Sequence, residues 1–278
     1  MSPIRSILLH ADGTTPWAER IPYAAAIART LEAELTTLYA VDSMWAQHPI
    51  ATMESPDAAA LMREVEERRL AAARAAYDRA TAGVDGCALH WKESSLVAPE
   101  HAVTRHALAA DLVILAQPEP GRAMEAAVPP HLIETVVIDS GRPALVVPYI
   151  GPPRQTGTTA LIAWKDTRES ARALTAALPF LRRASRVHLA TWAEAEEWPL
   201  PRPDVVGYLR RHGIQVTPRP CGPAPVHVGD AILSLAADLS ADLLVMGCYG
   251  HSRARERVLG GATRSILASM TLPVLMAH

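Results

Sequence analysis

The sequence predicts an α/β fold in which two similar domains, each built on a five-stranded parallel sheet, follow one another along the chain. The first observation is an internal repeat, because the segment ADLVILA at 110–116 returns as ADLLVMG at 241–247. The second is that each copy is followed by a further apolar segment, RPALVVP at 142–148 and LPVLMAH at 272–278. The third is a regular alternation of strand-like and helix-like segments, which is typical of parallel sheets covered by helices.

The expected strands are short and strongly apolar. The runs at 112–115, 144–147 and 243–246 contain no polar residue, as in strands covered by helices on both faces. Strand–helix–strand order gives right-handed crossovers and therefore a parallel sheet. The first domain has expected strands at 4–10, 34–41, 87–92, 111–116 and 143–147, and the second at 159–164, 186–192, 214–219, 242–247 and 273–277.

The two halves also begin in the same way. Residues 6–28 and residues 160–178 each read as a strand, a polar turn and an Ala-rich amphipathic helix. The segment 149–159 is rich in Gly, Pro and polar residues and lies between the halves. It predicts domains at 1–150 and 155–278.

Composition and charge exclude several classes of protein. The chain has 278 residues, of which 49% are hydrophobic and 20% charged, and its formal net charge is −2. Such values are typical of a folded protein and provide no positive field for a nucleic acid or a membrane surface. No apolar run has the length of a membrane span or a signal peptide, so a cytoplasmic location is expected. The three cysteines are far apart, and no disulfide framework or metal site is expected.

Residues 246–267, MGCYGHSRARERVLGGATRSIL, join the end of a predicted strand to the start of a predicted helix. The segment holds Gly247, Gly250, Gly260 and Gly261 together with four arginines. Flexible backbone, many amide groups and positive charge between a strand and a helix are features of a phosphate-binding loop. A solvated surface loop has part of the same composition, so both interpretations stay open at this point.

The spacing of three of these glycines resembles a known nucleotide-binding motif. Gly247, Gly250 and Gly260 form the pattern G-x2-G-x9-G, which resembles the core motif of the universal stress protein family. The resemblance is strong in the second half and weak in the first, and the two-half layout resembles the tandem members of that family. It implies an adenine nucleotide alpha hydrolase-like sandwich in each half. It also implies ATP or another adenine nucleotide as the ligand, with an accompanying Mg²⁺ ion left open.

The resemblance further implies which residues contact the nucleotide. Amide groups around the glycines would face the phosphates, and the helix that starts near Ala262 would direct its positive end toward them. The implied cofactor-binding residues are Gly247, Gly250, His251, Ser252, Gly260, Gly261, Ala262, Thr263, Lys165 and Asp166.

Two positions depart from the family's pattern. The family usually has Ser or Thr after the last motif glycine, where this chain has Gly261, although Thr263 and Ser265 follow closely. Many members end their first strand in an Asp that faces the nucleotide. An ungapped alignment places Lys165 at that position and Asp166 one residue later. The lysine would either meet a phosphate or fill the pocket.

The first half departs from the pattern in the opposite way. It keeps the strand-end acid as Asp12, but its fourth strand is followed by a segment with the single glycine Gly121 and prolines at 118, 120, 129 and 130. Proline has no amide hydrogen, so a backbone cradle for phosphate cannot form there in the same way. The first domain is therefore expected to be a structural partner with a degenerate motif, while the second binds the nucleotide.

Three functions remain open from the sequence. The first is a stress-response sensor or regulator that binds an adenine nucleotide in its C-terminal domain. The second is an interaction scaffold that binds no nucleotide, and the third is an enzyme such as a slow ATPase. Neither 11–16 nor 164–169 has the glycine- and serine-rich phosphate loop of an adenylating enzyme, and no catalytic residue is assigned. The resemblance implies a pseudo-dimer within the chain and leaves a homodimer open.

Overall fold

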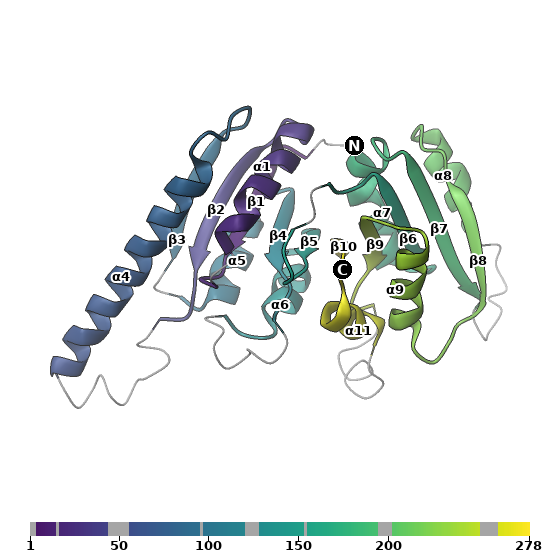
Figure 1. Ribbon diagram of the computed structural model, residues 1–278. Coiled ribbons are helices and arrows are strands. Elements are labelled where there is room, and N and C mark those ends of the chain that lie inside the picture. The colour runs from purple at the N-terminus through teal and green to yellow at the C-terminus, as the bar shows by residue number, and fades with distance from the viewer. Residues whose placement is uncertain are drawn as a thin grey trace. The chain divides into compact units, whose positions relative to one another are not determined.

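The computed structural model describes residues 4–14, 17–43, 56–94, 97–119, 128–152, 155–193, 202–250 and 261–278. By packing, the chain divides into two compact units, residues 4–136 and residues 137–278. The division falls within helix α6 (Leu132–Ser140). Each unit is an α/β sandwich and is described by itself (Figure 1).

The unit 4–136 has a parallel sheet in the strand order β3-β2-β1-β4. Strand β1 is central, and its residue Ile7 pairs with Leu35 of β2 on one side and Leu112 of β4 on the other. The elements are β1 (Ser6–Ala11), the 3-10 turn η1 (Trp17–Glu19), α1 (Arg20–Leu31), β2 (Glu34–Ala40), α4 (Pro56–Thr81), β3 (Leu89–Ser94), α5 (Pro99–Ala107) and β4 (Leu112–Ala116).

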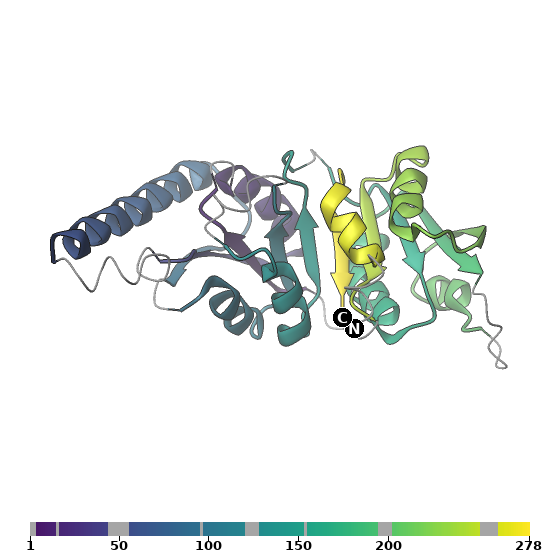
Figure 2. The same cartoon turned by 90° about the horizontal axis from the view of Figure 1, so that it is seen from below.

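The unit 137–278 has the strand order β5-β10-β9-β6-β7-β8. Neighbouring strands are parallel except β5 and β10, which are antiparallel. In Figure 2, α9 and α11 lie on one side of this sheet and α7 and α8 on the other. The elements are β5 (Ala144–Val147), β6 (Thr159–Trp164), α7 (Arg168–Leu181), β7 (Arg186–Ala193), α8 (Val205–Arg211), β8 (Thr217–Pro223), α9 (Val228–Asp238), β9 (Leu243–Gly247), α11 (Ala262–Ser269) and β10 (Val274–Ala277).

All ten expected strands are present, and the apolar runs form the buried centre of each sheet. The largest displacement is at β8, which the sequence pattern predicts at 214–219 and which spans Thr217–Pro223. Ile214 is buried just before the strand begins, and the strand itself contains Pro218 and Pro220. Prolines are tolerated there because β8 is last in the strand order of its sheet, where one row of amide hydrogens has no strand partner.

Strand β5 packs with the unit 137–278, although the sequence pattern assigns it to the first half. Val146 pairs with Val274 and Leu145 with Leu275, so β5 is held by the last strand of the chain. The packing division therefore lies earlier than the segment 149–159. The proposed domains at 1–150 and 155–278 stay a prediction.

The repeated ADL segments have the same structural role in both units. The Asp111 carboxylate, just before β4, accepts hydrogen bonds from the amides of Arg5 at 2.8 Å and Ser6 at 3.1 Å. The Asp242 carboxylate, just before β9, accepts from the three amides of 157–159 at 2.9–3.0 Å. Each aspartate thus connects the start of one central strand to the start of its neighbour.

No helix within these described ranges is long and apolar enough to cross a lipid bilayer.

Candidate functional site

A cavity of about 550 Å³ opens in the unit 137–278, where β6, β7 and β9 end. The strand ends contribute Trp164, Trp192 and Gly247, and the N-terminal turns of α7, α9 and α11 complete the walls. Ligands of open α/β sheets bind outside the carboxyl ends of the strands, and ligand sites have volumes of roughly 300–1,000 Å³. The cavity therefore has the place and the size of a small-molecule site.

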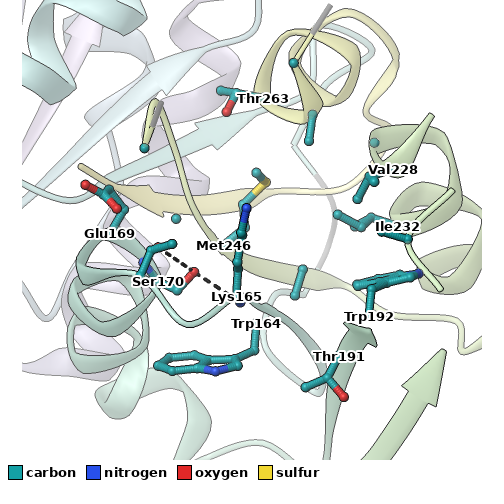
Figure 3. Close-up of a pocket in the computed structure, with 18 of the residues that line it drawn as sticks. Trp164, Lys165, Glu169, Ser170, Thr191, Trp192, Val228, Ile232, Met246 and Thr263 are labelled. Atoms are coloured by element: carbon teal, nitrogen blue, oxygen red, sulfur yellow. Dashed lines mark hydrogen bonds between the residues drawn. The ribbon is translucent and has the colours of Figure 1, made fainter. Parts of the chain in front are cut away.

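The cavity has an apolar side and a polar side. Trp192 from the end of β7 gathers with Val228 and Ile232 of α9 on the apolar side, and Glu169 and Ser170 of α7 lie on the polar side (Figure 3). This division follows from the elements, because a strand end supplies the indole while the first turn of a helix supplies short polar groups. A ligand with a flat apolar part and a charged part would match both sides.

The N-terminus of α11 lies at the cavity, and no side chain in the described part of the chain caps it. Its N-cap is Gly261, which makes no side-chain hydrogen bond to the helix, and its first turn contains no acidic residue. Thr263 is only 3% exposed and lines the cavity. Its hydroxyl points into the cavity (Figure 3) and has no hydrogen-bond partner among the described residues. The amides at a positive helix end, together with a hydroxyl donor, form an environment that attracts an anion.

Lys165 adds a positive charge to this environment. It follows the last residue of β6, and its side chain extends into the middle of the cavity (Figure 3). Asp166 also lines the cavity, but its carboxylate accepts a hydrogen bond of 2.6 Å from the indole nitrogen of Trp164. Of the two residues, the lysine is thus the one that reaches the space a ligand would fill.

The start of α7 is capped by its own side chains. Thr167 is the N-cap, and its hydroxyl accepts a hydrogen bond from the Ser170 amide at 3.3 Å. The Ser170 hydroxyl in turn accepts from the Lys165 amide at 3.4 Å. A Thr or Ser N-cap of this kind satisfies amides that the helix itself leaves unpaired. These bonds fix the turn that joins β6 to α7.

Glu169 places a carboxylate on the polar side of the cavity. Its side chain is 4% exposed and its Oε1 accepts a hydrogen bond of 2.5 Å from Arg168. Burial raises the pKa of Glu169, but hydrogen bonds from Arg168, its own amide and Thr167 outweigh that effect, and the pKa lies below its ordinary value. The carboxylate is therefore ionised at neutral pH.

Asp230 is the corresponding acid at the start of α9. Its Oδ1 accepts a hydrogen bond of 2.5 Å from the Ser265 hydroxyl of α11. The two helices approach each other closely at Gly229. A Cβ added to this glycine would lie only 2.7 Å from the Ser265 Cβ. The glycine before Asp230 thus allows α9 and α11 to bring their N-terminal turns to the same cavity.

The structure changes the explanation of the motif glycines. A Cβ on Gly247 would lie 2.5 Å from the Ser170 amide nitrogen, so the glycine is required by the contact between β9 and α7. A Cβ on Gly250 would lie 3.0 Å from Oε2 of Glu169, the flexible end of a side chain. Both glycines therefore make room for α7, whatever their amides contact.

The implied site residues that the structure describes gather at this cavity. They are Gly247, Gly250, Gly261, Ala262, Thr263, Lys165 and Asp166. His251, Ser252 and Gly260 lie outside the described residues. The sequence reasoning missed Glu169, Trp192 and Ile232, which also line the cavity. Trp192 could have been found from its position at the end of an expected strand, whereas Ile232 has the spacing of an ordinary core residue.

At the matching strand end of the unit 4–136, the polar groups bond to one another. Asp12 accepts hydrogen bonds from Arg20 at 2.7 Å and from the Thr14 hydroxyl at 2.6 Å, and both Asp12 and Arg20 are buried. His10 forms a hydrogen bond of 2.8 Å with the carbonyl of Ala40. The strand-end acid that the resemblance implies for ligand contact is therefore paired inside the protein.

Comparison with known proteins gives one family. Residues 222–278 match the model of the Universal stress protein family. A segment of 49 residues is 43% identical to Universal stress protein Slr1230 of Synechocystis sp. (strain ATCC 27184 / PCC 6803 / Kazusa), and this match covers 18% of the present chain and 17% of that protein.

Solved structures match the chain over nearly its whole length. The crystal structure of a universal stress protein from Archaeoglobus fulgidus DSM 4304 has a TM-score of 0.70 and 15% identity, covering 98% of this chain and 96% of that one. A protein from Pseudomonas aeruginosa UCBPP-PA14 has a TM-score of 0.58 and 15% identity, covering 98% and 92%. At 15% identity, the structural matches show only that the fold is shared. The similarity in sequence to the family model lies in residues 222–278. Residues 222–278 are therefore similar in sequence to the universal stress protein family, and the chain has the fold of a solved universal stress protein over nearly its whole length.

Proposed function

We propose that the unit 137–278 binds an adenine nucleotide and that the chain acts as a nucleotide-dependent sensor or regulator in a stress response. The observation that carries the proposal is a cavity that joins an apolar side to the N-terminus of α11, which has no side-chain cap, and to the hydroxyl of the buried residue Thr263, which has no partner among the described residues. A nucleotide has the matching two-part chemistry, with a flat purine at one end and phosphate at the other.

The apolar side suits the purine. The indole of Trp192 offers a flat surface for stacking, and Val228 and Ile232 enclose the same space from α9. Stacking of a base on an aromatic side chain contributes about 1–3 kcal/mol of binding free energy. The purine would therefore lie between the end of β7 and the first turns of α9.

The α11 end suits a phosphate. The amides of Ala262 and Thr263 are in the first turn, where the helix dipole is positive, and Lys165 brings a full positive charge into the same cavity. Gly247 and Gly250 of the motif line the cavity as well. The family usually has Ser or Thr at the position of Gly261, which supplies no hydroxyl here. In this chain, Thr263 would supply the hydroxyl to the phosphate instead.

Calorimetric titration with AMP, ADP and ATP tests the proposal, together with native mass spectrometry of protein purified without added nucleotide. Thr263→Val keeps the shape of the side chain and removes the hydroxyl. It should weaken nucleotide binding about tenfold, since a hydrogen bond to a charged group contributes about 1.5–3 kcal/mol.

Thr37→Val is the matched control, because Thr37 is also buried with an unpartnered hydroxyl but lies on β2 of the other unit. It should leave binding unchanged. If no adenine nucleotide binds, or if the two valine variants bind alike, the proposed site is wrong. A complete lack of binding would favour the interaction scaffold.

A further inference from the structure

The N-termini of α7, α9 and α11 meet at the cavity, and they differ in their N-cap side chains and in the acidic residues of their first turns. Helix α7 has Glu169 in its first turn and a Thr167 cap, and α9 has Asp230 in its first turn. Helix α11 has neither an acid nor a side-chain cap. A carboxylate in the first turn neutralises the positive end of a helix dipole. Within the described part of the chain, α11 is therefore the one N-terminus at this cavity that is left for an anion from the ligand.

Glu169 places a carboxylate in the cavity beside the backbone of the glycine motif. Its Oε2 would be 3.0 Å from a Cβ on Gly250, so the carboxylate lies directly beside the motif backbone. Arg168 forms an ion pair with it, but the Arg168 side chain is 69% exposed and largely solvated. A second or third phosphoryl group that left α11 along the backbone at 247–250 would therefore approach a buried negative charge.

The charges that line the cavity also favour a short anion. Among the described lining residues, Lys165 and Arg202 are cationic and Asp166 and Glu169 are acidic. A monophosphate brings about two negative charges, which the positive end of α11 attracts. A triphosphate brings further negative charge into a cavity whose described lining already holds Asp166 and Glu169.

We infer that the ligand of this cavity is an adenine nucleotide with a single phosphoryl group, and that Glu169 disfavours the di- and triphosphate. This inference rests on the proposed function and names the ligand class within it. Thr263 and the amides of α11 hold the one phosphate, and Glu169, which lines the same cavity beside Gly250, acts as the specificity-determining residue.

Calorimetric titrations of the full chain with AMP, ADP, ATP and adenosine in EDTA test the inference, and the ATP titration is repeated with Mg²⁺. AMP should bind about tenfold more tightly than ATP, and adenosine should bind more weakly than AMP. Glu169→Gln removes the charge and keeps the shape. It should narrow the difference between AMP and ATP by raising the affinity for ATP.

Asp238→Asn is the matched control, since Asp238 is an exposed acid at the end of α9 that does not line the cavity. It should leave the ratio of AMP to ATP affinity unchanged. Wild-type protein that binds ATP as tightly as AMP, with or without Mg²⁺, would overturn the inference while leaving the proposed function intact. Equal binding of adenosine and AMP would overturn it too. Absence of binding by all four compounds would instead refute the proposed function itself.

Discussion

Two residues at equivalent strand ends show how differently the two units treat charge. After β1, Asp12 forms an ion pair with Arg20 in which the side chains are 7% and 6% exposed. After β6, Lys165 extends into an open cavity. Breaking a buried ion pair leaves one charge without a partner, which is far more costly than losing a solvated charge. The first unit thus depends on its strand-end residue for stability, whereas the strand-end residue of the second lines the cavity.

Asp12→Asn should lower the free energy of unfolding by about 3–5 kcal/mol at neutral pH, because the Arg20 guanidinium would remain buried and uncompensated. Urea denaturation followed by circular dichroism measures the change. The double variant Asp12→Asn/Arg20→Met should recover much of the loss, since it removes both charges. A double variant no more stable than the single one would show that the pair is not the cause.

The same pair predicts a pH dependence. Burial raises the pKa of Asp12, but the charges of Arg20 and His10 and the hydrogen bonds from Thr14 outweigh it, and the pKa falls below the ordinary 3.8. The stabilisation is therefore present above pH 3.8 and is lost as the pH falls through the lower folded-state pKa. The stability difference between wild type and Asp12→Asn should shrink in strongly acidic buffer. A difference that stayed constant would contradict this account.

At the scale of elements, the repeated aspartates connect the starts of neighbouring strands. Asp242→Ala should lower the free energy of unfolding by about 1–3 kcal/mol, because the amides of 157–159 would lose their acceptor where β6 begins. Asp111→Ala should cost less, since Asp111 accepts from two amides. Asp238→Ala, at an exposed position, serves as the control. Thermal or urea denaturation of the three variants compares the effects, and equal stabilities would exclude this role.

At the scale of the whole molecule, the asymmetry predicts one nucleotide per chain. The unit 137–278 holds the cavity, whereas the strand end in the unit 4–136 is occupied by Asp12, Thr14 and Arg20. Native mass spectrometry of the full chain with excess AMP should add one ligand mass. Thr263→Val should lower the occupancy of that one site. Two bound ligands of similar affinity would contradict the asymmetry.

The sequence by itself determined the elements and the location of the candidate site. Apolar runs, helical spacing and the repeat are local patterns, so they predicted all ten strands, and the strand–glycine–helix segment pointed to the edge of the sheet where the cavity lies. The bounds of β8 differ from the expected 214–219, because prolines weaken a strand pattern and the sequence does not show that this strand lies at an edge.

Only the tertiary structure decided which residues from distant parts of the chain contact, pair with or hydrogen-bond to one another. Local patterns do not specify contacts between distant segments. Examples are the position of Glu169 beside Gly250, the ion pair of Arg20 with Asp12, and the pairing of β5 with β10. The same holds for Gly247, whose missing Cβ serves the contact with α7. Side-chain charge is visible in a sequence, but whether a charge is paired, buried or open to a ligand depends on the packing around it.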